Sequence, residues 1–165
     1  YYKNYWSQIN NIKIVEYQFK NNRRDISFEE VIALKATKYA SISGNRILFM
    51  PNSLDRSSYV PDRYRNRESP FEIQRGYLDE DEYTIDLPKG YAIEAMPEAT
   101  LVENEFGHYN VNIEYLPDEH KLQYRRSFFL KNGTYPKEQY NPYREFRKKV
   151  STTDNAQVVL IKTSI

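Results

Sequence analysis

Two runs of strictly alternating apolar and polar residues, separated by a short polar turn, form the clearest pattern in the sequence. Alternation with a period of two is typical of a strand with one buried face, and residues 117–120 have the length and polarity of a hairpin turn. Closing the hairpin there predicts the cross-strand pairs Tyr115–Leu122, Ile113–Tyr124, Val111–Arg126 and Tyr109–Phe128. A slip of one residue would expose every apolar side chain, so the pattern specifies both the register and a packed face.

Weaker patterns predict further strands and one helix. The segments with strand composition or alternation are 12–20, 26–39, 46–50, 83–87, 91–95 and 156–162. A helix over 142–151 is predicted by Asn141 as its cap, Pro142 as its first residue and an apolar stripe that includes Phe146. We therefore expect a mainly β fold, an antiparallel β-sandwich with one short C-terminal helix and a final strand.

The length of 165 residues suits one domain or two small ones. Aromatic residues at helical spacings in residues 1–9, including Trp6, indicate the end of a linker helix from an upstream module. We expect residues 10–165 to form a single β-sandwich domain. The segment 51–70 is rich in Pro, Ser, Asn, Asp and Arg, so it is the candidate for an internal boundary or a long surface loop.

Composition removes several kinds of chemistry. The chain has no cysteine, which excludes disulfides, zinc–thiolate sites and thiol nucleophiles. Its two histidines, His108 and His120, lie at opposite ends of one predicted strand, too far apart to share a metal or a proton relay. The sequence contains no P-loop, no dinucleotide fingerprint and no Gly-x-Ser-x-Gly elbow. We therefore expect a domain that is not an enzyme and has no cofactor or metal site.

Charge and hydropathy argue against two classes of partner, nucleic acids and membranes. A net charge of +1 and a pI near 8.0 argue against nucleic-acid binding. No apolar run approaches the roughly 18 residues of a membrane-spanning helix, so we expect no membrane insertion. The aromatic content of 15% is high, and tyrosine suits strands with one wet face because its ring packs while its hydroxyl stays solvated.

The binding candidates are Arg63, Tyr64, Arg65, Arg67 and Trp6. Arginines two residues apart would project from one side of an extended segment, a geometry able to grip carboxylate, phosphate or sulfated sugar. Two structural explanations compete with that function. The segment is either a charged edge or an arginine ladder paired with the carboxylates of 79–82, which themselves are expected to be a solvated charge run rather than a calcium site.

Arg126 is unusual because the hairpin register places it among apolar residues. A buried guanidinium needs a counter-ion. We expect it to pair with Glu94 or Glu103, or else to extend its stem towards a sheet edge.

Several short motifs occur in a familiar order: Ser43-Gly44-Asn45-Arg46, Arg63 to Arg67, Gly76 to Tyr83, Leu87-Pro88-Lys89-Gly90-Tyr91, Glu105-Phe106-Gly107 and Gly133-Thr134-Tyr135-Pro136. This order, over about residues 10–165, resembles the C-terminal accessory domain of Bacteroidetes transglutaminase-like proteins. The resemblance implies a β-sandwich without catalytic residues, exported with its parent to the periplasm or cell envelope. It carries over no member of the parent's Cys-His-Asp triad, because this chain has no cysteine to match the nucleophile.

The function that we expect is that of a non-catalytic accessory domain, which packs on, or positions substrate for, the upstream core of a transglutaminase-like protein. The upstream module of the same polypeptide is then its first partner. The alternative is a carbohydrate-binding module for envelope or dietary polysaccharide. A third hypothesis, a hydrolase with an unrecognised carboxylate pair, would require loss of turnover on Asp or Glu substitution.

Overall fold

The computed structural model describes residue 6 and residues 9–163. Its elements are β1 (Ile12–Asn22), β2 (Ser27–Ala36), β3 (Ser41–Ser43), β4 (Arg46–Phe49), β5 (Phe71–Ile73), β6 (Tyr77–Asp86), β7 (Tyr91–Ala95), β8 (Thr100–Asn104), β9 (Gly107–Leu116), β10 (Lys121–Leu130), β11 (Gly133–Tyr135), the 3-10 helix η1 (Lys137–Gln139), α2 (Tyr140–Asp154) and β12 (Val158–Lys162). The expected fold class is confirmed: antiparallel strands dominate, and one C-terminal helix precedes a final strand.

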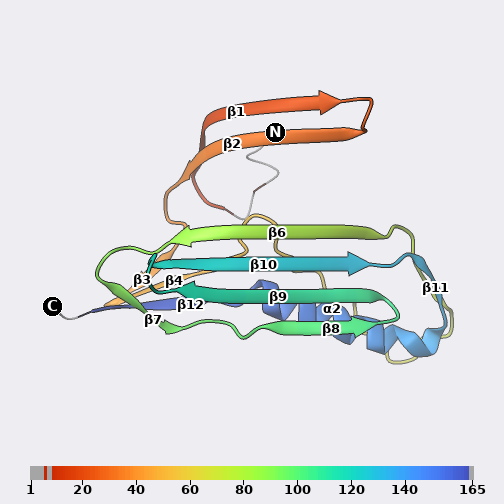
Figure 1. The fold of residues 1–165 in the computed structure, drawn as a ribbon. Coiled ribbons are helices and arrows are strands. Elements are labelled where there is room, and N and C mark those ends of the chain that lie inside the picture. The colour runs from red at the N-terminus through yellow and green to blue at the C-terminus, as the bar shows by residue number, and fades with distance from the viewer. Residues whose placement is uncertain (1–5, 7–8, 164–165) are drawn as a thin grey trace. The chain divides into compact units, whose positions relative to one another are not determined.

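The chain forms two compact units, Tyr1–Ser41 and Ile42–Ile165. The first contains the two-stranded antiparallel sheet β1–β2, drawn in orange in Figure 1. The expected linker helix over residues 1–9 lies outside the described residues, except for Trp6 and Ile9, which form a turn closed by the Ile9 N–H donating to the Trp6 carbonyl at 3.0 Å. The expected domain limits remain predictions.

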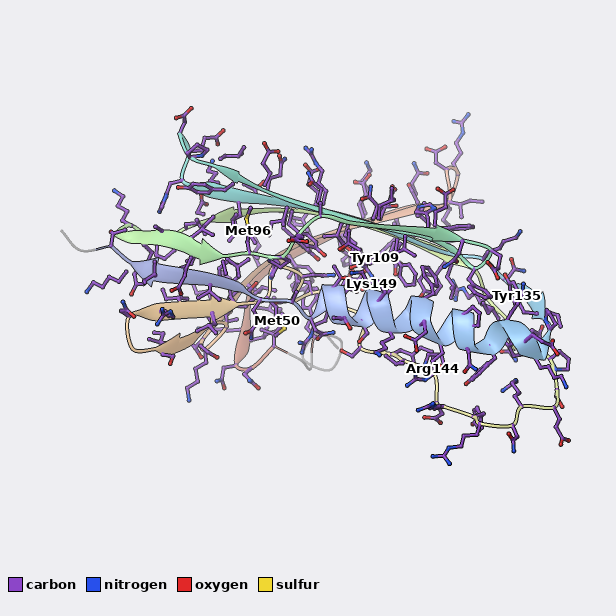
Figure 2. All side chains as sticks on the ribbon, turned by 90° about the horizontal axis from the view of Figure 1, so that it is seen from below. Met50, Met96, Tyr109, Tyr135, Arg144 and Lys149 are labelled. Atoms are coloured by element: carbon purple, nitrogen blue, oxygen red, sulfur yellow. The ribbon has the colours of Figure 1, made fainter. Side chains whose placement is uncertain are left out.

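The second unit contains the strand orders β6-β10-β9-β8 and β3-β4-β12-β7, with a short β11-β5 pair. Figure 2 shows the β6-β10-β9-β8 sheet as one layer, with α2 and the strands β4, β12 and β7 together forming the layer beneath it. Side chains of both layers meet in the core, among them Leu122 and Ile113 from the first and Leu160 and Phe49 from the second, all of them buried.

The β9–β10 hairpin has the predicted register. The pairs Tyr115–Leu122, Ile113–Tyr124, Val111–Arg126 and Tyr109–Phe128 are all present. Along β10, residues alternate between buried and more exposed positions, so the hairpin places its apolar set, together with Arg126, on the inner face of the sheet. The alternation in the sequence is therefore sufficient to predict the register of this hairpin.

Helix α2 packs through the predicted stripe, because Phe146 contacts the rings of Phe106 and Phe128 on the sheet. Its start differs from the prediction. The helix begins at Tyr140, with Gln139 as an N-cap that makes no side-chain bond, so the expected cap at Asn141 is wrong. The physical reason is η1, which already turns the chain after Pro136 and accepts the Tyr140 N–H at the Lys137 carbonyl.

Candidate functional site

Arg126 lies at the centre of a buried ion cluster inside the second unit. Its side chain comes from the middle of β10 and the residue is 3% exposed. Its Nε donates to Asp154 Oδ1 at 3.0 Å and its Nη1 to Asp81 Oδ2 at 2.7 Å. Asp154 is the last residue of α2 and Asp81 belongs to the neighbouring strand β6, so the ion pairs join the two layers.

The partners expected for Arg126 are wrong. Glu94 instead pairs with Arg46, and the residue that faces Glu103 across the strands is His108. The acidic run also differs from the expectation of solvated charges before a strand. It lies within β6, where Asp79 and Asp81 turn inward and Glu80 and Glu82 outward, so the strand period divides the four carboxylates between two faces.

The electrostatics of this cluster follow from crowding of carboxylates around one guanidinium. Burial alone would lower the pKa of Arg126, but the charges of Asp154 and Asp81 more than offset it and hold the pKa above its usual range. Asp55 approaches Arg126 Nη1 only to 3.9 Å. Burial, together with the charges of Asp81 and Asp79, raises the pKa of Asp55 to about 6.

Two tyrosines complete the network as neutral donors. The Tyr109 hydroxyl donates to Asp154 Oδ1 at 2.7 Å, and the Tyr83 hydroxyl donates to Asp81 Oδ1 at 3.1 Å. Burial, and then the neighbouring carboxylates, raise the pKa of both phenols. The inward carboxylates Asp81 and Asp154 are thus occupied by internal donors, and the arrangement acts as a structural clamp between β10, β6 and α2.

A second polar feature lies on the surface, between loop 61–67 and helix α2. We call it the basic groove. It has a volume of about 620 Å³, and its lining residues are Arg63, Tyr64, Arg65, Asn141, Arg144, Glu145 and Lys148. Four cations therefore face one carboxylate. Figure 2 shows Arg144 on the side of α2 that points away from the β6-β10-β9-β8 sheet.

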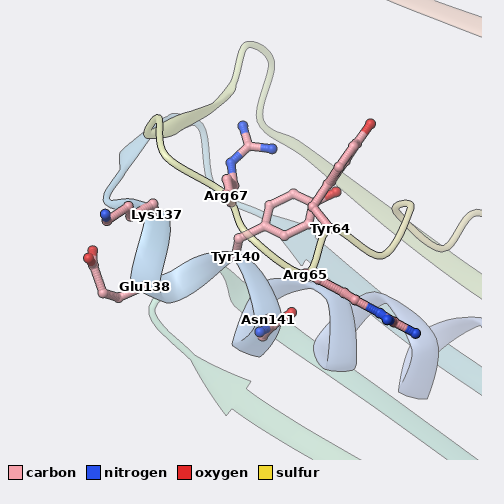
Figure 3. Close-up of a pocket in the computed structure, with 7 residues that line it drawn as sticks. All are labelled: Tyr64, Arg65, Arg67, Lys137, Glu138, Tyr140 and Asn141. Carbon is pink, nitrogen blue, oxygen red and sulfur yellow. The ribbon is translucent and has the colours of Figure 1, made fainter.

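Loop 61–67 is held against the helix by the residues that flank the two groove arginines. The Tyr140 hydroxyl donates to the Asp62 carbonyl at 2.9 Å, and the Tyr64 and Tyr140 rings lie 5.7 Å apart. Arg67 lies beside Tyr140 (Figure 3), with its guanidinium 4.4 Å from the centre of the ring. The same guanidinium donates to the carbonyls of Ser69 and Pro70. The loop is therefore positioned on both sides of Arg63 and Arg65.

A smaller hollow of about 170 Å³ adjoins the loop at the start of α2, and Figure 3 draws its lining: Tyr64, Arg65, Arg67, Lys137, Glu138, Tyr140 and Asn141. Tyr64 and Arg65 line both hollows. Tyr64 is 50% exposed, so it offers ring surface to a ligand while it also contacts Tyr140.

The structure brings most of the candidate residues together but gives them different roles. Arg63, Tyr64 and Arg65 line the basic groove, whereas Arg67 is engaged by aromatic rings and backbone carbonyls. Within the described residues, the expected ladder to the carboxylates of 79–82 is not formed: Asp81 pairs with Arg126 and Glu82 with Arg125. Trp6 belongs to the other compact unit.

Sequence reasoning missed the helix wall of the groove. Its members Asn141, Arg144, Glu145 and Lys148 follow the spacing i, i+3, i+4 and i+7 of one helix face. The sequence alone predicts this polar face, because it lies opposite the apolar stripe of the helix. It does not predict that loop 61–67 lies against that face, which only the fold shows.

The described part of the chain contains neither a metal-binding cluster nor a membrane-spanning helix. Across residue 6 and residues 9–163, no three His, Asp or Glu side chains gather so as to hold a metal ion. No helix in the same residues has the length and apolar character needed to cross a membrane.

Comparison with known proteins gives a family but no activity. Neither the curated proteins nor the solved structures contain a match to this chain. The family model described as "Domain of Unknown Function with solved-structure structure (DUF3858)" matches residues 45–160, well over half of the chain. The matched segment includes the hairpin, the Arg126 cluster and the basic groove. The chain therefore belongs to the DUF3858 family, a family of unknown function.

Proposed function

We propose that this chain is a non-catalytic interaction domain that packs on, or positions substrate for, the upstream core of an exported transglutaminase-like protein. In this proposal the parent acts in the periplasm or cell envelope, and the first partner is the upstream module of the same polypeptide. The observation that carries the proposal is a largely apolar face on the β1–β2 sheet, with exposed aromatic rings.

We call this surface the ribbon face. The cross-strand register places on it Ile12, Ile14, Tyr17, Phe19, Phe28, Ile32, Leu34 and Ala36, together with Glu30 opposite Phe19 and Asn21 opposite Phe28. Towards the turn that connects the two strands, Tyr17, Phe19 and Phe28 are 59%, 66% and 59% exposed, and the two phenylalanine rings stack 6.3 Å apart. The opposite face is mostly polar, with the pair Lys20–Glu29 among its members.

Exposed rings on a two-stranded sheet call for a covering partner. A sheet of two strands has marginal stability in water unless its apolar face packs on something. Contiguous exposed apolar surface is also typical of protein interaction sites. The ribbon face precedes the DUF3858 match along the chain, and this order supports docking on a module that lies upstream.

The chemistry of the second unit also supports a non-catalytic role. Asp81 and Asp154, the inward carboxylates closest to Arg126, are engaged by internal donors. His108 contacts Ser127 and His120 contacts Tyr115, so within the described residues the two imidazoles serve separate local contacts.

A binding measurement tests the proposal. Isothermal titration of the chain with the upstream part of its natural polypeptide should give measurable heat. Tyr17→Ser combined with Phe19→Ser should weaken the affinity at least tenfold, because buried aromatic residues dominate such interfaces. Leu101→Ser is the control, since Leu101 is 72% exposed on β8 and lies outside the ribbon face. Equal affinity for the ribbon variant and the control would contradict the proposal.

Carbohydrate binding is a second candidate function. It is favoured by the half-exposed Tyr64 ring beside the cations of the basic groove, because aromatic rings pack on sugar faces and arginine forks bind carboxylate. A glycan-dependent change in tyrosine fluorescence would support it. The absence of any change with neutral or charged glycans would remove it.

A further inference from the structure

We propose that the basic groove binds an acidic polysaccharide, a sugar chain that carries repeated carboxylate or sulfate groups. The inference rests on the second candidate function above and specifies its ligand class and site. Its residues are Arg63, Tyr64 and Arg65 from the loop, and Arg144 and Lys148 from α2.

Unused donors line both walls of the groove. Within the described part of the chain, no hydrogen bond or ion pair engages the side chain of Arg63 or Arg65. On the helix wall, Arg144 and Lys148 share the single carboxylate of Glu145, at 3.1 and 3.8 Å. An anionic ligand would therefore neutralise charge that the protein itself leaves unbalanced.

The two walls space their cations in a way that suits a repeating anion. Arg63 and Arg65 are two residues apart in the loop, about 7 Å if that stretch is extended. Arg144 and Lys148 are one helical turn apart, about 6 Å along the axis. A polymer with regularly placed charges can engage several of these cations at once, and each additional contact raises the effective affinity.

The groove is positioned before any ligand arrives. The contacts of Asp62, Tyr64 and Arg67 with Tyr140 fix the loop against the start of α2. Binding to a preformed site avoids the entropy of ordering a loop. Arg63 and Arg65 take no part in these fixing contacts, so they can be replaced without loss of the fold.

Several features favour a sugar chain over a nucleic acid. The net charge is only +1 and the pI is near 8.0, below the range typical of nucleic-acid-binding domains. Arginine forks match the planar carboxylate group, and Tyr64 supplies a ring face for a neighbouring sugar. Single-stranded nucleic acids stack successive bases on several aromatic residues, whereas the basic groove offers one half-exposed ring, that of Tyr64.

The test measures the binding of defined oligosaccharides to the whole chain. The probes are oligogalacturonate, the same oligomer with its carboxylates methyl-esterified, a heparin-derived sulfated oligosaccharide and a single-stranded oligonucleotide. Arg63→Gln combined with Arg65→Gln removes two groove charges. The matched control is Arg23→Gln with Arg24→Gln, which removes the same charge from the exposed turn between β1 and β2.

We expect at least one charged oligosaccharide to bind, and the tighter of the two identifies the preferred anion. The groove variant should bind at least tenfold more weakly, the control should bind like the parent, and added salt should weaken binding. Identical thermal unfolding of the parent and both variants would show that the loss is local.

Three results would overturn the inference. Equal binding of the esterified oligomer would show recognition of neutral sugar, which would leave glycan binding in place but not the acidic ligand. Tighter binding of a single-stranded oligonucleotide would assign the groove to nucleic acid. Absence of binding by every oligosaccharide would remove the carbohydrate function itself, while the ribbon-face proposal would be decided separately by the upstream module.

Discussion

At the scale of single residues, Arg126 determines how the two layers of the second unit are joined. Replacing it by Met leaves Asp81 and Asp154 buried without their counter-ion. We expect Arg126→Met to lower the free energy of unfolding by about 3–5 kcal/mol, measured by urea denaturation. Arg125→Met is the control, because Arg125 pairs with Glu82 on the exposed face and such pairs contribute less than about 1 kcal/mol. Similar losses for both variants would contradict the role given to the buried cluster.

Asp55 gives the cluster a pH dependence with a definite sign. Burial raises its pKa in the folded state to about 6, above the ordinary 3.8, so its negative charge opposes folding at neutral pH. Asp55→Asn should therefore stabilise the protein above pH 6, by less than about 1 kcal/mol because the side chain is 53% exposed and screened by solvent. This advantage should fall as the pH decreases through 6 towards 3.8. Urea denaturation at pH 7.5, 5 and 4 checks it, and an advantage that grows towards low pH would contradict the assignment.

At the scale of elements, the hairpin and the strand around Gly107 specify the first layer. Gly107 has a φ of 139°, and an added Cβ would lie 1.9 Å from the Phe129 carbonyl oxygen. Gly44 also has a positive φ, 58°, but open space surrounds its Cβ position. We expect Gly107→Ala to destabilise the protein by roughly 3 kcal/mol or more and Gly44→Ala by about 1 kcal/mol. Thermal unfolding compares the two, and the reverse order would show that the β9–β10 packing is described wrongly.

What the sequence predicts at this scale depends on how local the cause is. The period-two alternation on each side of residues 117–120 is local, so it yields the hairpin register and the inward Arg126. The partner of Arg126 is not local, because Asp154 reaches it only when the end of α2 packs under the sheet. The basic groove likewise has a local part, which the sequence predicts, and a tertiary part, which it does not. Its loop residues are evident from their composition, whereas its helix wall requires the tertiary contact between Tyr140 and Asp62.

At the scale of the whole molecule, the chain consists of a DUF3858 unit with a clamped interior and a separate two-stranded unit with an apolar face. Within the described residues, the DUF3858 unit pairs its buried guanidinium Arg126 with internal carboxylates, and its basic groove leaves the side chains of Arg63 and Arg65 without an ion pair. The two-stranded unit leaves large aromatic rings exposed. This difference between the two units supports our central claim, which is that the domain serves interaction and not catalysis.

The most direct test of that claim is a titration of the isotope-labelled chain with the upstream part of its natural polypeptide, followed by backbone amide shifts. We predict shifts that cluster on β1 and β2 around Tyr17, Phe19 and Phe28. Shifts confined to the basic groove, or no shifts at high micromolar concentration, would contradict docking through the ribbon face.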